Sequence, residues 1–273
     1  MKELITRALS GVLYITLLIL SLYYQNTLLI LFLGFGIVCL IEFKKLIQFR
    51  SFIPYIIFII LYLGIAYWSL MNPSKTGFNI SVQTLQLLTL WMQLILINNL
   101  FSKNPNSFLT NNPLLLTTFY ISSAFVFIAL IANYNNAFTP LILLGAFILI
   151  WVNDTFAYLI GKNFGKRKLF PSISPKKTIE GFIGGLIFSC IASYFIATFT
   201  YTLTFAHWLA LSIIVSVFGT LGDLIESKFK RQANVKDSGT IMPGHGGLLD
   251  RLDSIIFVAP FFYLYLRLIT YVS

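Results

Sequence analysis

Charge is scarce in this 273-residue chain, in which only 10% of the residues are charged and 58% are hydrophobic. This composition excludes an ordinary soluble domain and is typical of an integral membrane protein. Cysteine is also scarce, and both Cys39 and Cys190 lie inside apolar segments, without the spacing of metal ligands. We therefore expect both thiols to be small packing residues.

The glycine-rich patterns of soluble nucleotide-binding proteins are missing, since the chain contains neither a Walker A sequence nor GxGxxG. The usual phosphate-binding loops of those folds are thereby excluded. What the chain has instead is a series of long apolar stretches, each near the roughly 20 residues that a bilayer-crossing helix needs. These stretches cover residues 8–24, 27–46, 53–71, 82–101, 114–132, 139–160, 181–199, 207–225 and 252–269. The sequence therefore predicts an all-α, polytopic integral membrane protein with about nine transmembrane helices.

Lysine and arginine predict the orientation of these spans. With the N-terminus inside, all 19 except Lys75 and Arg267 fall on the cytoplasmic side, many of them in the loops 162–177 and 228–251. This asymmetry follows the positive-inside rule. We therefore expect a multi-pass protein of the inner membrane whose active site faces the cytoplasm. The net charge of +10 needs no nucleic acid, because an anionic membrane surface and an anionic substrate account for it.

The acidic residues divide the chain in two. Only Glu3 and Glu42 precede residue 150. The other seven are Asp154, Glu180, Asp223, Glu226, Asp237, Asp250 and Asp253. We therefore expect residues 1–140 to form a transmembrane scaffold, and residues 141–273 to form a catalytic transmembrane domain with the two basic loops.

Three of these acids lie at the ends of predicted spans, next to a basic loop. Asp223 ends the eighth span, with Ser227 four residues further along the same helical face. Asp250 and Asp253 share a face at the start of the ninth span. Magnesium is usually held by one or two carboxylates, waters and substrate phosphates. The sequence therefore predicts a metal site here, and the alternative is simple pairing of these acids with neighbouring arginines.

Asp154 follows a long apolar run in the sixth span. A charged side chain inside the bilayer costs about 2.5–3.5 kcal/mol on insertion scales, so Asp154 should face the protein interior. Two interpretations stay open: Asp154 is a third acid of the site, or it pairs with Lys162 or Lys176.

The first basic loop ends in Ser174-Pro175-Lys176-Lys177, just before a glycine-rich span. Ser174 is predicted to cap a helix that has Pro175 at its first position. Such a helix N-terminus with two lysines favours phosphate binding, although ordinary capping is the alternative. The GxxxG pair at residues 181 and 185 is predicted to pack closely against another helix.

Glycines follow the histidine in His245-Gly246-Gly247 within the second basic loop. They allow the backbone to approach a ligand and to turn its N–H groups toward an anion. His245 is expected to donate a hydrogen bond or a proton to a phosphate.

These residues together resemble the signature of the phosphatidate cytidylyltransferase family, the CDP-diacylglycerol synthases. The resemblance rests on Ser227, Lys230-Arg231, Lys236-Asp237, His245-Gly246-Gly247 and Asp250-Arg251-x-Asp253, with residues 174–181 and Asn153-Asp154 upstream. It covers roughly residues 150–254. It implies transfer of the cytidylyl group of CTP to phosphatidic acid, giving CDP-diacylglycerol and pyrophosphate. It also implies a homodimer and a magnesium-dependent site in which Asp223 and Asp250 match the metal-binding acids, together with a monovalent cation such as potassium.

Attack of a lipid phosphate on the α-phosphorus of CTP is mainly a matter of positioning and charge neutralisation. The residues expected to be catalytic are Asp223, Asp250, Lys230, Arg231, His245 and Arg251, and those expected to hold metal are Asp223, Asp250 and Asp253. The residues expected to bind substrate are Ser174, Lys176, Lys177, Thr178, Ser227, Lys228, Lys236, Asp237, Gly246 and Gly247. Two alternatives are a CTP-dependent polyprenol or phytol kinase and a transporter of an anionic metabolite. A transporter predicts polar residues near the midplane and an inverted repeat, and the sequence has charges gathered at one face instead.

Overall fold

The computed structural model describes residues 2–67, 78–102, 107–134, 137–244 and 246–272. Helices dominate this part of the chain, and a two-stranded hairpin is its one sheet. In order, the elements are α1 (Lys2–Ser21), α2 (Gln25–Leu46), α3 (Ile53–Leu61), η1 (Tyr62–Tyr67), α5 (Phe78–Phe101), α6 (Ser107–Asn111), α7 (Pro113–Leu116), η2 (Thr117–Ser122), α8 (Ser123–Ile131), α9 (Pro140–Phe164), β1 (Lys168–Phe170), β2 (Ser174–Thr178), α10 (Ile179–Thr200), α11 (Phe205–Gln232) and α12 (Leu249–Val272).

Seven helices of the described residues are long and apolar enough to cross a membrane. They are Gln25–Leu46, Ile80–Phe101, Pro113–Ile131, Pro140–Phe164, Ile179–Thr200, Phe205–Gln232 and Leu249–Thr270. The other two predicted spans correspond to the shorter apolar helices Leu9–Ser21 and Ile53–Tyr67. The end of the predicted span 53–71 lies outside the described residues. The all-α polytopic fold is thus confirmed, and the count of about nine spans is approximate.

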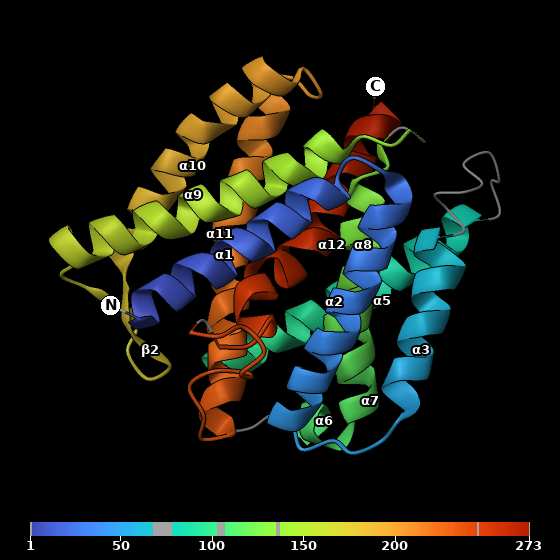
Figure 1. The fold of residues 1–273 in the computed structure, drawn as a ribbon, viewed down its shortest axis with the longest axis horizontal. Helices are drawn as coiled ribbons and strands as arrows, with labels where there is room; N and C mark the ends of the chain where they lie inside the picture. The colour runs from blue at the N-terminus through green and yellow to red at the C-terminus, as the bar shows by residue number, and fades with distance from the viewer. Residues whose placement is uncertain (1, 68–77, 103–106, 135–136, 245, 273) are drawn as a thin grey trace.

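The connections gather at two opposite edges of the molecule (Figure 1). The hairpin, the loop after α11 and the short helix α6 lie at the lower edge. The turn between α10 and α11 and the C-terminus lie at the upper edge, with α11 and α12 in the middle. The two basic loops therefore share one edge, as the sequence predicts.

Polar side chains on α5 join it to α12. Gln93 donates from Nε2 to the Phe257 carbonyl at 3.1 Å, and Gln86 donates to the Pro260 carbonyl at 3.2 Å. The glutamines that make 82–101 the least apolar of the predicted spans thus find hydrogen-bond acceptors on a neighbouring helix, where lipid tails would offer none.

Small residues bring α9 and α10 into close contact. A Cβ on Gly181 would lie 2.6 Å from the Ala157 carbonyl oxygen, and one on Gly185 would lie 2.7 Å from that of Asn153. Any side chain at either position would push the helices apart. The predicted close packing at the GxxxG pair is confirmed.

The start of α10 differs from the prediction. Ser174 does not cap a helix, because residues Ser174–Thr178 form strand β2, paired antiparallel with β1. Thr178 is the N-cap instead, and its hydroxyl oxygen accepts the Gly181 N–H at 3.1 Å. Pairing with β1 keeps the backbone before Thr178 extended, and proline disfavours helical geometry in the residue before it. The lysines of this segment therefore lie on a strand that leads into the helix.

Candidate active site

Lys230 lies at the centre of a buried ionic cluster near the C-terminal end of α11. Its Nζ is 2.5 Å from Oε2 of Glu226, one turn earlier on the same helix, and 2.7 Å from Oδ1 of Asp250 on α12. All three side chains are largely removed from solvent. One ammonium group therefore links α11 to the first turn of α12 and compensates two buried carboxylates.

Asp250 also holds the loop that joins these two helices. Its carboxylate accepts the N–H groups of Ser238 at 2.9 Å and Gly247 at 2.7 Å. Gly246 has φ +90°, and a Cβ there would lie 2.6 Å from Oδ2 of Asp250. Glycine is required at residue 246 by both its backbone conformation and this contact. The N–H of Gly247, predicted to face a bound anion, faces a carboxylate of the protein itself.

A second ion pair joins the hairpin to α11. Lys177 on β2 places its Nζ 2.5 Å from Oδ2 of Asp223, and the Ser227 hydroxyl donates to the other oxygen of Asp223 at 3.3 Å. Asp223 and Ser227 thus share one helical face, as predicted. Burial alone would lower the pKa of Lys177, but the Asp223 carboxylate outweighs burial and raises that pKa above its ordinary value. Lys177 is therefore a firmly protonated cation at neutral pH.

Two further acids interact electrostatically with Asp223. Asp253 interacts electrostatically with Asp223, Asp154 and Lys230. Asp154 interacts with Asp223 and Lys177, and its Oδ1 accepts a hydrogen bond from the side chain of the preceding asparagine at 3.3 Å. The side chain of Asp154 is exposed rather than turned into the protein interior as predicted, and both interpretations, a third acid of the site or a partner of Lys162 or Lys176, stay predictions.

Glu42 on α2 belongs to the same assembly, although it lies in the half of the chain predicted to be scaffold. Its carboxylate accepts the N–H groups of Leu248 at 3.1 Å and Leu249 at 2.8 Å, and the Ser238 hydroxyl at 3.2 Å. These groups flank Asp250 and the start of α12. Glu42 is not among the predicted site residues, and the signal that would have found it is a single acid within an otherwise apolar span.

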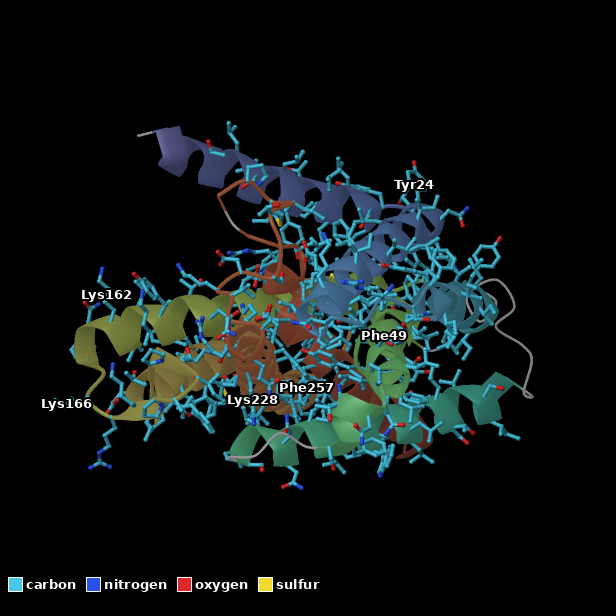
Figure 2. The ribbon with its side chains drawn as sticks, turned by 90° about the horizontal axis from the view of Figure 1, so that it is seen from below. Tyr24, Phe49, Lys162, Lys166, Lys228 and Phe257 are labelled. Carbon is cyan, nitrogen blue, oxygen red and sulfur yellow. The ribbon has the colours of Figure 1, made fainter. Side chains whose placement is uncertain are left out.

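Lys228 and Arg231 point to backbone groups outside the cluster. Lys228 donates to the carbonyl groups of Asn99 and Ser102 at the end of α5. Figure 2 shows Lys228 close to this helix, far from Lys162 and Lys166 at the outer end of α9. Arg231 donates to the carbonyl of Val235 at 3.1 Å, beyond the end of α11. Their predicted roles in substrate binding and catalysis stay predictions.

The remaining predicted residues border the cluster or lie on its outer surface. Thr178 and Ser227 are buried, whereas Ser174 is half-buried. The exposed ones are Lys176, Lys236, Asp237 and Arg251. His245 lies outside the described residues. The structure therefore brings together five of the predicted residues: Asp223, Asp253, Lys177, Lys230 and Asp250. It adds Glu226, which the sequence could have indicated because Glu226 lies four residues before Lys230, on the same helical face.

No group of three or more His, Cys, Asp or Glu side chains in the described chain is arranged to hold a metal ion, so the predicted magnesium site stays a prediction. Magnesium needs only one or two protein carboxylates when phosphates complete its shell. Asp223 already binds the Lys177 ammonium at 2.5 Å, and the negative charge of Asp223 acts on the Asp253 carboxyl. Both carboxylate oxygens of Asp250 accept hydrogen bonds, so a metal cation could bind there only by replacing the Lys230 ammonium.

Comparison with known proteins agrees with this geometry. The model of the cytidylyltransferase family matches residues 5–269. The phosphatidate cytidylyltransferase of Bacillus subtilis (strain 168) is 35% identical over 278 residues, covering 98% of this chain and 99% of that protein. Those of Staphylococcus aureus (strain COL) and Staphylococcus haemolyticus (strain JCSC1435) are 43% and 42% identical, over 70% of this chain and 72% of theirs. The chain therefore belongs to the phosphatidate cytidylyltransferase family, and its members are nucleotidyltransferase enzymes.

Proposed function

We propose that this protein transfers the cytidylyl group of CTP to phosphatidic acid, giving CDP-diacylglycerol and pyrophosphate. The observation that carries the proposal is the cluster in which Lys177 pairs with Asp223, and Lys230 pairs with Asp250. It lies between the hairpin and the loop after α11, at the edge where both basic loops meet. A site for two phosphorylated substrates needs this combination of cationic side chains and cation-binding acids.

The chemistry asks the protein mainly to bring anions together. An oxygen of the lipid phosphate attacks the α-phosphorus of CTP, the bond from that phosphorus to the bridging oxygen breaks, and pyrophosphate leaves. The attacking phosphate is ionised near neutral pH, so no strong general base is needed. Lys177 and Lys230 neutralise phosphate charge and orient the reacting groups, which is where most of the acceleration arises in such transfers.

A divalent cation, magnesium, is part of the proposal. Asp223 and Asp253 would hold it, and Asp250 would join them if Lys230 moves from the carboxylate to a phosphate. When bound, the cation would supply further neutralisation of charge at the reacting phosphates. The protonated Lys177 beside Asp223 would then be released toward the nucleotide.

The cluster lies where a water-soluble and a lipid substrate can meet. CTP would arrive from the cytoplasm, and phosphatidic acid would arrive laterally within the leaflet. The basic residues at this edge support an orientation in the inner membrane with the site facing the cytoplasm. The family likeness further supports a homodimer, which native mass spectrometry of the detergent-solubilised protein tests directly.

Family membership argues against both alternatives from the sequence. A polyprenol or phytol kinase would move the γ-phosphoryl group of CTP, and a transporter would move no group at all. In the described residues, the ion pairs join the hairpin strand β2, the C-terminal part of α11 and the first turn of α12, whereas transport sites lie at the midplane between repeats.

The deciding experiment uses purified protein with phosphatidic acid, magnesium and CTP labelled at the α-phosphorus. We expect label to enter the organic phase with release of pyrophosphate, EDTA to stop both, and Asp223→Asn to abolish both without loss of folding. Repeating the assay with sodium in place of potassium tests the monovalent cation. Lipid labelling from γ-labelled CTP alone would support the kinase, and no signal from folded protein would contradict both enzymatic functions.

A further inference from the structure

Glu42 is a buried carboxylate that the reaction described above does not use. It lies on α2 with 1% of its surface exposed, and all the hydrogen bonds described for its carboxylate come from the loop 238–249. Both oxygens are engaged, Oε1 by the Leu248 N–H and Oε2 by the Leu249 N–H and the Ser238 hydroxyl. The side chain therefore binds the two ends of one loop.

The loop has no space for larger residues where it meets this carboxylate. A Cβ on Gly239 would lie 2.4 Å from Oε1 of Glu42, and one on Gly247 would lie 2.6 Å from Oε2. Real Cβ atoms do not approach other atoms so closely. The loop backbone is thus fitted around the Glu42 carboxylate at both of its ends.

Glu42 and Asp250 take their donors from the same two short segments. Ser238 gives its N–H to Asp250 and its hydroxyl to Glu42. Gly247 gives its N–H to Asp250, while the next N–H, that of Leu248, goes to Glu42. A shift of the loop that breaks the bonds to Glu42 must therefore also displace the donors that orient Asp250.

Membrane insertion alone does not explain a carboxylate at this position. An acid within an apolar span is costly, and an apolar side chain of similar size would favour the helix more. The carboxylate also lies at the N-terminus of α12, where the helix dipole and free N–H groups favour negative charge. The negative charge of Glu42 therefore stabilises the loop 238–249 and the first turn of α12.

We propose that Glu42 is a positioning residue for cytidylyl transfer. By holding both ends of the loop 238–249 against α2, it keeps Asp250 directed at Lys230 and at the site beside them. This role rests on the proposed function. It makes the N-terminal helices part of the catalytic assembly, whereas the sequence predicts only a scaffold there.

The test compares Glu42→Gln with Ser238→Ala, and with Cys39→Ala as a control on the same helix. Cys39 is fully buried and lies one turn from Glu42, so this control changes the packing of α2 without touching the loop. For each variant we would measure kcat and KM for CTP, the melting temperature, and amide hydrogen exchange of the peptide covering residues 238–250. In Glu42→Gln, one carboxylate oxygen is replaced by a donor that faces backbone N–H groups.

We expect Glu42→Gln to lower kcat by about 100-fold, the cost of a misplacement near 1 Å, with a smaller change in KM. Exchange should rise in the loop peptide and not in the other helices. Ser238→Ala should give a smaller change in the same direction, and Cys39→Ala should resemble the wild type.

Wild-type kcat in Glu42→Gln, or faster exchange throughout the protein, would overturn the positioning role. If Glu42→Gln fails to fold, unchanged kcat and exchange in Ser238→Ala would overturn it as well, and a local loss in that variant would support it. Absence of label transfer by the wild type would overturn the proposed function and this role with it. Normal transfer by the wild type and by Glu42→Gln would overturn the role of Glu42 alone.

Discussion

Removal of the Lys230 ammonium should have a large effect on stability as well as on activity. The side chain of Lys230 is 11% exposed, and its partners Glu226 and Asp250 are 0% and 8% exposed, so water compensates little when the ammonium is lost. Removing one partner of a buried ion pair typically costs about 3–5 kcal/mol. At roughly 2–4 °C per kcal/mol for a domain of some 150–250 residues, Lys230→Met should lower the melting temperature by about 6–20 °C.

The double variant Lys230→Met/Glu226→Gln separates stability from chemistry. Neutralising Glu226 leaves one uncompensated buried carboxylate instead of two, so part of the lost melting temperature should return. Transfer activity should stay absent, because the cationic group at the reacting phosphates is still missing. Scanning fluorimetry in detergent and the label-transfer assay measure the two quantities, with the exposed Lys45→Met as a matched control.

Two results would refute this reasoning. A melting temperature unchanged by Lys230→Met would mean that the ammonium does not compensate the buried acids. Recovery of activity in the double variant would mean that Lys230 serves the charge balance of Glu226 and not the substrates.

Three further predictions concern the surroundings of the cluster. Lys228→Met should lower the melting temperature and leave KM for CTP nearly unchanged, because Lys228 binds the carbonyl groups that end α5; a large rise in KM would instead support its predicted role in substrate binding. Gly247→Ala should abolish transfer, because its Cβ would lie 2.0 Å from Oγ of Ser238, whereas Gly34→Ala, with nothing within 4 Å, should be neutral in the same assay. Because the pKa of Lys177 is raised, its ion pair stabilises the fold fully below the ordinary lysine pKa of about 10.4 and loses this effect as pH rises through the higher folded value. The difference in melting temperature between the wild type and Lys177→Met should therefore be constant from roughly pH 6 to 9, and a difference that disappears within this range would contradict the raised pKa.

The fold class and part of the candidate site were predictable from local patterns. Apolar stretches of membrane length determine the spans, and positions four residues apart on a helix determine that Ser227 binds Asp223. These features depend on neighbours in the sequence, which a single chain displays. Asp223 and Asp250, predicted to hold a metal ion or to pair with arginines, pair with Lys177 and Lys230 instead.

Contacts between distant segments could not be predicted in the same way. Glu42 binds groups 196 to 207 residues away, and no local pattern records that distance. The capping of α10 was mispredicted because Ser174 and Thr178 both suit an N-cap, and the choice between them depends on pairing of β2 with β1. Lys177 likewise reaches Asp223 only because this hairpin folds back against α11.

The hydrogen bonds from α5 to α12 have a consequence for how the chain enters its membrane. During synthesis α12 leaves the ribosome after α5, whose two glutamines are polar groups that lipid tails cannot satisfy. Gln93 and Gln86 precede the α12 carbonyl groups that accept their hydrogen bonds by 164 and 174 residues. Helix α5 would thus have to stay beside the insertion site, without mixing into bulk lipid, until α12 arrives. Insertion of α12 into the membrane would then depend on its binding to α5. Correct packing of the helix bundle would depend on the order in which the helices are released into the lipid.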